Sequence, residues 1–214
     1  MNPTRHSEVS VNKRGGAVSD YLEIHSFIDH TKVLCSDGRH RILHNHWAIH
    51  NLVIPIFGHS ITNSDGRTVD VKDMCEEDHL LVDYRKRFIP TLSDFVSSID
   101  DNALDSNFAQ QVEQFHQQFA ITSEISELML SPLMVTGNLK SLLITHNSWF
   151  VNNILPRIHQ SSIHITEFTM TPTLLFESMN YQMWMDNGAE LPPSAKRLNH
   201  KKLKTEAKVC RAST

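Results

Sequence analysis

The sequence lacks the long apolar segment that a membrane protein needs. A helix that spans a bilayer takes about 20 consecutive apolar residues, and the longest apolar stretches, such as LVIPIF at 52–57, are far shorter. The first residues, MNPTRHSEVSVNKRGG, also lack the apolar centre of a secretory signal. We therefore expect no membrane span and no signal peptide.

Cysteine is scarce as well. Cys35, Cys75 and Cys210 are odd in number and form no CxxC pair, so a disulfide framework is not expected. Scarce and unpaired cysteines are typical of a reducing compartment. The sequence thus predicts a cytoplasmic protein.

The familiar catalytic motifs are missing too. The chain contains no GxSxG, GxxxxGK, GxGxxG or HExxH sequence, which would indicate a serine nucleophile, a nucleotide-binding loop or a zinc protease. Covalent catalysis and nucleotide-driven work are therefore disfavoured. Whether the protein is an enzyme stays open at this stage.

What is present is the composition of a folded protein, since 40% of the residues are hydrophobic and 21% are charged. We predict a mainly α fold with a small β-hairpin (α+β). The expected parts are a flexible leader at 1–19, a histidine-rich helical domain with the hairpin at 20–99, a second helical or mixed region at 106–187 and a basic tail at 188–214.

Local patterns place the elements. Apolar spacings of three and four predict helices at 21–35 and 39–54, and the second should end before Pro55. An Asp-Gly pair at 65–66 predicts a hairpin between strands at 60–62 and 68–71. Residues 72–88 read as a third helix, residues 161–170 as a strand, and no internal repeat is apparent.

Histidine is the main chemical signal. Eight of the fourteen histidines fall within 55 residues: His25, His30, His40, His44, His46, His50, His59 and His79. His25 and Asp29 lie four apart, so their side chains project from one face of the first predicted helix. Asp37, His40 and His44 repeat this spacing on the second.

Two antiparallel helices could bring these groups around one ion, with a further ligand from Glu77, His79 or Asp83 on the third helix. The predicted metal ligands are His25, Asp29, His40 and His79. Imidazole and carboxylate donors suit one divalent Zn, Mn or Fe ion rather than Ca. The alternative is that these histidines are structural, because helical histidines often cap helix ends or bond a carboxylate.

Two arginines flank the predicted site and suggest what it would act on. Arg39 and Arg41 stand on either side of His40, where they could bind an anion such as phosphate. Ion pairs with neighbouring aspartates are the alternative use. A metal with cationic neighbours would be equipped for metal-dependent phosphoester hydrolysis.

Several short motifs occur in a specific order: HSFID at 25–29, RHR at 39–41, ITNSDGR at 61–67, EDH at 77–79 and IPT at 89–91. In this the chain resembles a family of uncharacterised bacterial and phage proteins, over about a third of its length. The resemblance implies a bacterial or phage origin, hence the bacterial cytoplasm, and carries no known activity.

The end of the chain supports a second functional hypothesis. Residues 196–214 hold seven basic residues and one acidic residue, a charge that could bind nucleic acid by releasing counterions. The alternative to a hydrolase is thus a non-enzymatic phage accessory protein that binds a host protein or nucleic acid.

Overall fold

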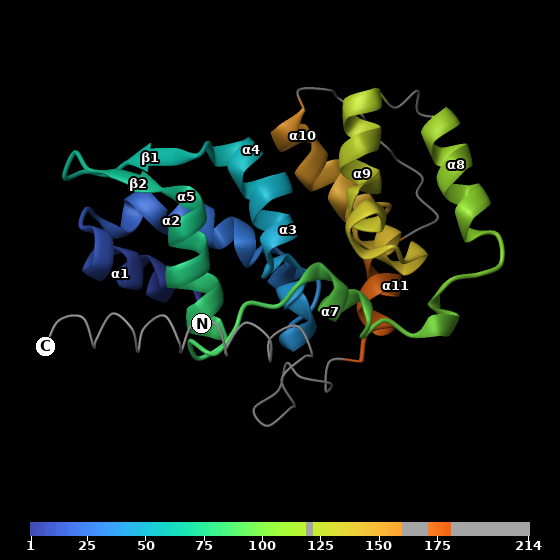
Figure 1. Ribbon diagram of the computed structural model, residues 1–214, viewed down its shortest axis with the longest axis horizontal. Coiled ribbons are helices and arrows are strands. Elements are labelled where there is room, and N and C mark those ends of the chain that lie inside the picture. The colour runs from blue at the N-terminus through green and yellow to red at the C-terminus, as the bar shows by residue number, and fades with distance from the viewer. Residues whose placement is uncertain (119–121, 160–170, 181–214) are drawn as a thin grey trace, which may run out of the picture.

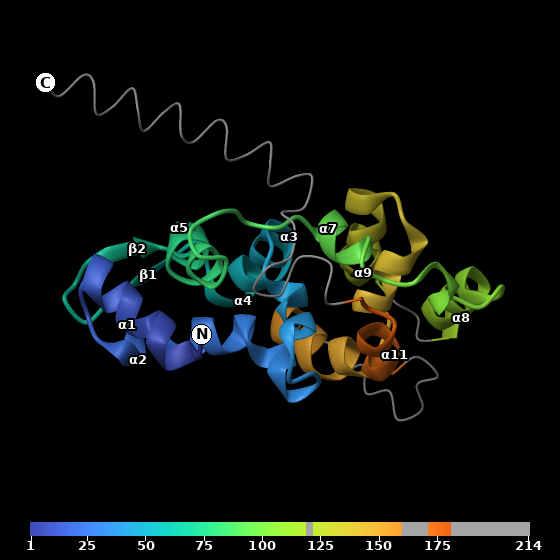
Figure 2. The same cartoon turned by 90° about the horizontal axis from the view of Figure 1, so that it is seen from below.

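The computed structural model describes residues 1–118, 122–159 and 171–180. The described chain is mostly helical with one two-stranded antiparallel hairpin (Figure 1), which confirms the predicted fold class. Seen from two directions, the N-terminal and C-terminal halves lie side by side (Figures 1 and 2). None of the helices in the described part is both long and apolar enough to cross a membrane.

The chain begins with a packed helix where a flexible leader was predicted. Helix α1 (Pro3–Arg14) is capped by Asn2 and packs antiparallel to α2 (Val18–Ile28). The buried face of α1 consists of His6, Ser7 and Ser10. Because this face is polar, apolar periodicity could not reveal it, and the prediction of a leader at 1–19 was wrong.

The middle of the N-terminal half alternates tight and wide helical turns. After η1 (His30–Val33) and η2 (Gly38–Leu43), both 3-10 helices, the chain forms α3 (His46–Ala48), the π-helical turn η3 (Ile49–Val53) and α4 (Ile54–Phe57). The helix therefore continues past Pro55, contrary to prediction. In an α-helix a proline ring clashes with the carbonyl group four residues before it. The π turn before Pro55 is wider than an α-helical turn and moves that carbonyl group away from the ring.

The predicted hairpin is present as β1 (Ser60–Thr62) and β2 (Thr68–Asp70). A third helix follows as α5 (Val71–Met74), the π-helical η4 (Cys75–Leu80) and α6 (Leu81–Asp83). It ends earlier than residue 88, because Arg85 and Lys86 take left-handed backbone angles. Helix α7 (Leu92–Val96) and η5 (Asp101–Ala103) lead to the second half.

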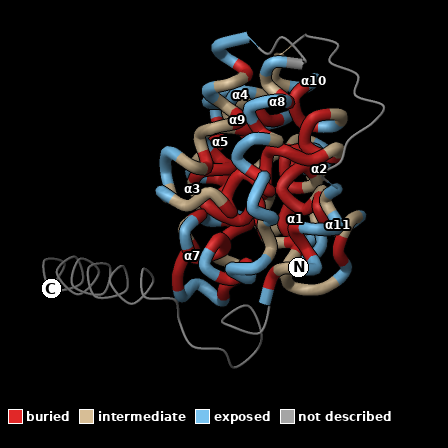
Figure 3. Tube along the Cα trace, turned by 90° about the vertical axis from the view of Figure 1, so that its right-hand side faces the viewer, coloured by how far each residue is buried: buried red, intermediate tan, exposed pale blue. Residues whose placement is uncertain are grey.

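The second half contains α8 (Phe108–Gln118), α9 (Ser123–Thr136), the 3-10 helix η6 (Leu139–Ile144), the π-helical η7 (Phe150–Ile154), α10 (Leu155–Ile158) and α11 (Pro172–Glu177). The strand predicted at 161–170 and the basic tail lie outside the described residues. Figure 3 shows that the buried positions run through the whole described body.

The second half repeats the local structure of the first. In each half a 3-10 helix precedes a His-Asn pair and a helix with a π turn, so His44 corresponds to His146 and Asn45 to Asn147. Asn45 accepts from Ala48 N and donates to Ile42 O, whereas Asn147 accepts from Phe150 N and donates to Ile144 O. The expectation of no internal repeat was therefore wrong.

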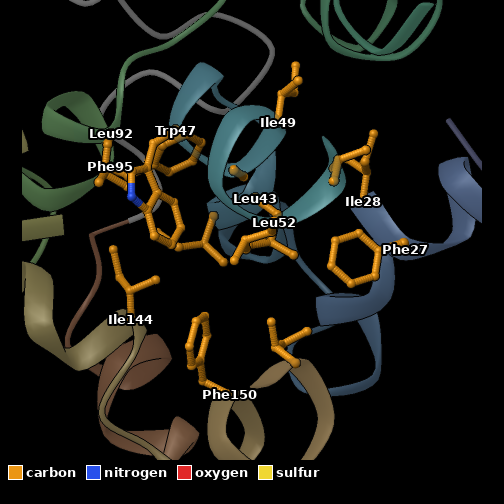
Figure 4. Packing of buried hydrophobic residues seen from close by; sticks show 14 of the residues in the cluster. Phe27, Ile28, Leu43, Trp47, Ile49, Leu52, Leu92, Phe95, Ile144 and Phe150 are labelled. Carbon is orange, nitrogen blue, oxygen red and sulfur yellow. The ribbon is translucent and has the colours of Figure 1, made fainter. Parts of the chain in front are cut away.

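Two tryptophans join the halves reciprocally. Trp47 donates its indole N–H to Ser131 Oγ on α9 at 2.8 Å, and the corresponding Trp149 donates to His30 Nδ1 on η1 at 3.0 Å. Asn51 and Asn153 hold the two helices alike, each bonding to the main-chain oxygen of its own tryptophan. The apolar core is continuous across this junction, from Phe27 to Phe150 (Figure 4).

Candidate metal centre

Four side chains from the N-terminal half converge at one buried point. Asp29 follows the last turn of α2, His44 follows η2, His79 lies in η4 and Asp83 ends α6. One ligand atom from each lies within 4.8 Å of all the others. The π turn of η4 and the four-residue step from His79 to Asp83 place both on the same face of that helix.

The distances between the donor atoms fit a shared ion. His44 Nε2 lies 3.4 Å from Asp29 Oδ1, 3.2 Å from Asp83 Oδ2 and 3.2 Å from His79 Nε2. Donors at about 2.1 Å from one ion stand about 3.0 Å apart at right angles and about 3.4 Å apart in a tetrahedron. The buried Asp/His cluster could therefore hold a metal ion.

Hydrogen bonding gives independent support. Several buried side-chain atoms around this point form no hydrogen bond: His6 Nε2, Asp29 Oδ1, His40 Nε2, Arg41 Nε, His44 Nδ1 and Asp83 Oδ2. Buried polar atoms in proteins are nearly always hydrogen-bonded, and a group of exceptions requires an explanation such as an ion. Their concentration here indicates a cation-binding centre.

The charges at the centre are those of metal ligands. Burial opposes ionisation of Asp29 and Asp83, but the neighbouring histidines outweigh it and hold the pKa of each carboxyl below its usual range. Burial lowers the pKa of His79 well below that of a free histidine. Anionic carboxylates and neutral imidazoles are the protonation states that bind a metal.

The structure brings together two of the four predicted ligands, Asp29 and His79. His40 lies beside them, with Nε2 3.9 Å from Asp29 Oδ1 and its pKa lowered by burial to about 4. His25 stands behind His79 and contacts it through Nδ1 at 3.0 Å. His44 was absent from the predicted ligands, although its four-residue spacing from His40 had placed both on one face of the second predicted helix.

Asp83 was named only as an alternative ligand, and its four-residue spacing from His79 is the signal that could have selected it. His6 was missed because α1 was taken as a leader. It lies fully buried beside Asp83.

A chain of hydrogen bonds orients His79 from behind. Ser10 Oγ donates to Asp78 Oδ2 at 3.1 Å and contacts His25 Nε2 at 2.9 Å. If His79 binds a metal through Nε2, its Nδ1 carries the proton and donates to His25 Nδ1. His25 then donates through Nε2 to Ser10, and every group in the chain is satisfied. Burial lowers the pKa of His25 to about 3, which keeps this ring neutral.

We expect Ser10→Ala to weaken metal binding without removing it. The substitution breaks the link between His25 and Asp78, so the ring of His79 loses its fixed orientation. Loss of such an outer contact typically lowers metal affinity about 10- to 100-fold. Competition with a chelator measures the change, and Ser7→Ala on the same helix is the control. Equal affinities of the two variants would contradict this role.

Cations line the outer side of the centre. Lys32 Nζ lies 2.6 Å from Asp29 Oδ2, and Arg41 Nε lies 3.8 Å from Asp83 Oδ2. Both side chains are partly exposed. Arg39 instead pairs with Asp37 through two nitrogens and donates to Phe176 O at 2.7 Å. Of the two predicted anion-binding arginines, Arg41 is thus the one placed at the centre.

The second half keeps the scaffold of this centre but changes its donors. His146, the counterpart of His44, faces His116 with the two Nε2 atoms 2.9 Å apart. Within the described ranges, the carboxylate-histidine cluster is found in the N-terminal half.

His146 predicts a pH effect on stability. Burial, followed by the nearby His116, lowers the pKa of His146 to about 3, whereas an unfolded histidine has a pKa of about 6.5. The unfolded chain therefore takes up this proton first, and stability is lost as the pH falls from about 6.5 toward 3. His146→Gln should reduce the loss of unfolding free energy between pH 7 and pH 5 by about 2 kcal/mol in urea titrations. An unchanged loss would contradict the assignment.

The geometry defines a helical protein with a buried Asp/His cluster able to hold a metal ion. Residues 1–104 match the model of a family described as a domain of unknown function (DUF6915). The match includes α1 and all four clustered residues. No curated protein and no solved structure matches the chain.

Proposed function

We propose that the protein is a metal-dependent phosphoester hydrolase. The observation that carries the proposal is the convergence of Asp29, His44, His79 and Asp83 at one buried point, where Asp29 Oδ1 and Asp83 Oδ2 form no hydrogen bond. Mixed nitrogen and oxygen donors suit Zn, Mn or Fe. Such an ion, when bound, supplies an activated water and stabilises charge on a phosphoryl oxygen.

The cations beside the centre support an anionic substrate. Arg41 Nε is buried and forms no hydrogen bond, and its guanidinium lies 5.4 Å from the ring centre of Tyr84. Lys32 pairs with Asp29, one of the proposed ligands. An ion shared by the two carboxylates would weaken their hold on these cations, and both could then turn to a phosphate. Arg39 would fix the neighbouring turn through Asp37.

The proposed setting is a bacterial cytoplasm, in a bacterial or phage-encoded protein. Cys35 and Cys75 support a reducing compartment, because both are buried free thiols. Binding of a host protein or nucleic acid through the basic tail remains a separate hypothesis, which deletion of residues 188–214 would test.

Hydrolysis of bis(p-nitrophenyl) phosphate tests the enzymatic proposal. Protein loaded with Mn is expected to release p-nitrophenol, His44→Ala to abolish turnover, and Arg41→Ala to raise KM more than it lowers kcat. The exposed His59 provides a matched control through His59→Ala. Turnover that persists in His44→Ala would identify a contaminant. Metal binding without turnover of phosphomonoesters or phosphodiesters would favour the non-enzymatic role.

A further inference from the structure

We propose that a basic turn at residues 85–87, beside the metal centre, binds the phosphate backbone of a single-stranded nucleic acid. The basic turn consists of three consecutive exposed cations, Arg85, Lys86 and Arg87. It lies between the third helix and α7, just after Asp83 (Figure 1). One consequence rests on the proposed function: the phosphoester that reaches the centre would be a nucleic-acid phosphodiester.

The backbone of the basic turn is unusual for the residues that form it. Arg85 and Lys86 have φ angles of 55° and 58°, a region that residues other than glycine seldom adopt. Glycine ends a helix in this conformation without steric cost. Two long cationic side chains at these positions are therefore unfavourable for the backbone, and such strained positions are concentrated at functional sites.

Main-chain hydrogen bonds and buried neighbours hold the basic turn in this shape. Lys86 N donates to Leu81 O. Arg87 N donates to Tyr84 O at 3.0 Å. Tyr84 and Phe88, on either side of the turn, are buried, and their ring centroids lie 4.8 Å apart. The three cations thus stand on a backbone that is already ordered, which lowers the entropy lost when an anion binds.

The basic turn is continuous with the cations of the metal centre. Consecutive Cα atoms are about 3.8 Å apart, so Arg85 Cα lies at most about 7.6 Å from Asp83 Cα. Arg41 contacts both neighbours of this step, with its guanidinium 5.4 Å from the ring centre of Tyr84 and Nε 3.8 Å from Asp83 Oδ2. Lys32 adds a further cation at the centre. A series of cations suits the repeated charges of a nucleic-acid backbone better than a single phosphate.

Two further observations favour a single strand over other polyanions. Proteins that rest on an anionic membrane usually insert apolar side chains into the lipid, whereas Tyr84, Phe88 and Ile89 beside the basic turn are buried. The ligands of the centre are buried as well, and a duplex is stiff over the length of such a site. A flexible single strand can bend to bring one phosphodiester close to the centre.

Arg85→Gly/Lys86→Gly tests the inference in the full-length protein, because glycine keeps the left-handed turn while both charges are removed. Fluorescence anisotropy measures the binding of a labelled thymidine oligonucleotide over a series of salt concentrations. We expect about 10-fold weaker binding or more, and a salt slope smaller by about 1.4, since each phosphate contact on a single strand contributes about 0.7. Arg87→Gln, outside the left-handed pair, should lower the slope by about 0.7. Arg67→Gln/Lys72→Gln removes the same charge near the hairpin and should match the wild type.

The other outcomes separate this site from the hydrolase. Wild-type affinity in both variants of the basic turn, or binding that is lost only when residues 188–214 are deleted, would overturn the site and leave the hydrolase to its own assay. Binding of phosphatidylserine vesicles in place of the oligonucleotide would also overturn it. Oligonucleotide binding that depends on the basic turn, in a protein that hydrolyses no phosphodiester, would support the site and remove the hydrolase.

Discussion

Apoprotein titrated with Mn, Fe or Zn is expected to bind about one ion per chain and to become markedly more stable. A ligand at 100 times its dissociation constant adds about 2.7 kcal/mol to the free energy of unfolding. For a chain of this length that corresponds to a rise in melting temperature of roughly 5–10 °C. His44→Ala should remove most of this rise, because its Nε2 contacts both carboxylates and His79.

The repeat within the chain provides the control. His146 occupies the position of His44 in the second half and is likewise fully buried, but it faces His116 and no carboxylate of the cluster. His146→Ala should therefore keep the full metal-dependent rise, measured by calorimetry on each variant. If both His44→Ala and His146→Ala lost the metal-dependent rise in melting temperature, or if neither did, the assignment of the centre to the first half would be wrong.

Asn45→Ala and Asn147→Ala are expected to destabilise the protein to a similar degree, by about 2 kcal/mol or more each. Each asparagine is buried, caps a helix and bonds to a carbonyl of the preceding 3-10 helix. Loss of a cap costs about 1 kcal/mol, and a buried group left without its partner costs about 1–3 kcal/mol. Denaturant unfolding measures both.

The pair should differ in metal binding. Asn45 directly follows the ligand His44, so Asn45→Ala should weaken the centre, whereas Asn147→Ala should leave metal affinity unchanged. The prediction fails if only one of the two variants is destabilised, because the two networks would then not be equivalent. It also fails if Asn147→Ala weakens metal binding.

The sequence predicted the parts of the fold that local chemistry determines. The Asp-Gly turn predicted the hairpin, apolar spacing located α2, and the acidic start and basic end of residues 72–88 located the third helix. Pro55 misled because a π turn precedes it, and a π turn has no single-residue signature. The repeat was missed because its halves share a few spaced residues, such as His-Asn and the following tryptophan, whose common role appears only through their hydrogen bonds.

In the candidate centre, too, local sequence patterns predicted some residues, whereas others depend on how the helices pack. Asp29 and His79 were found through residue type and helical spacing. The position of His25 behind His79 depends on how α2 and η4 pack, which spacing does not determine. His6 escaped notice because α1 buries polar residues against other polar residues, so its contribution follows from tertiary contacts alone.

The most direct test of the account is elemental analysis of the untagged, purified full-length protein by inductively coupled plasma mass spectrometry. We expect about one Mn, Fe or Zn per chain, retained in His146→Ala and lost in His44→Ala. A protein that holds no stoichiometric metal as purified and takes up none after reconstitution would contradict the metal centre and the hydrolase built on it.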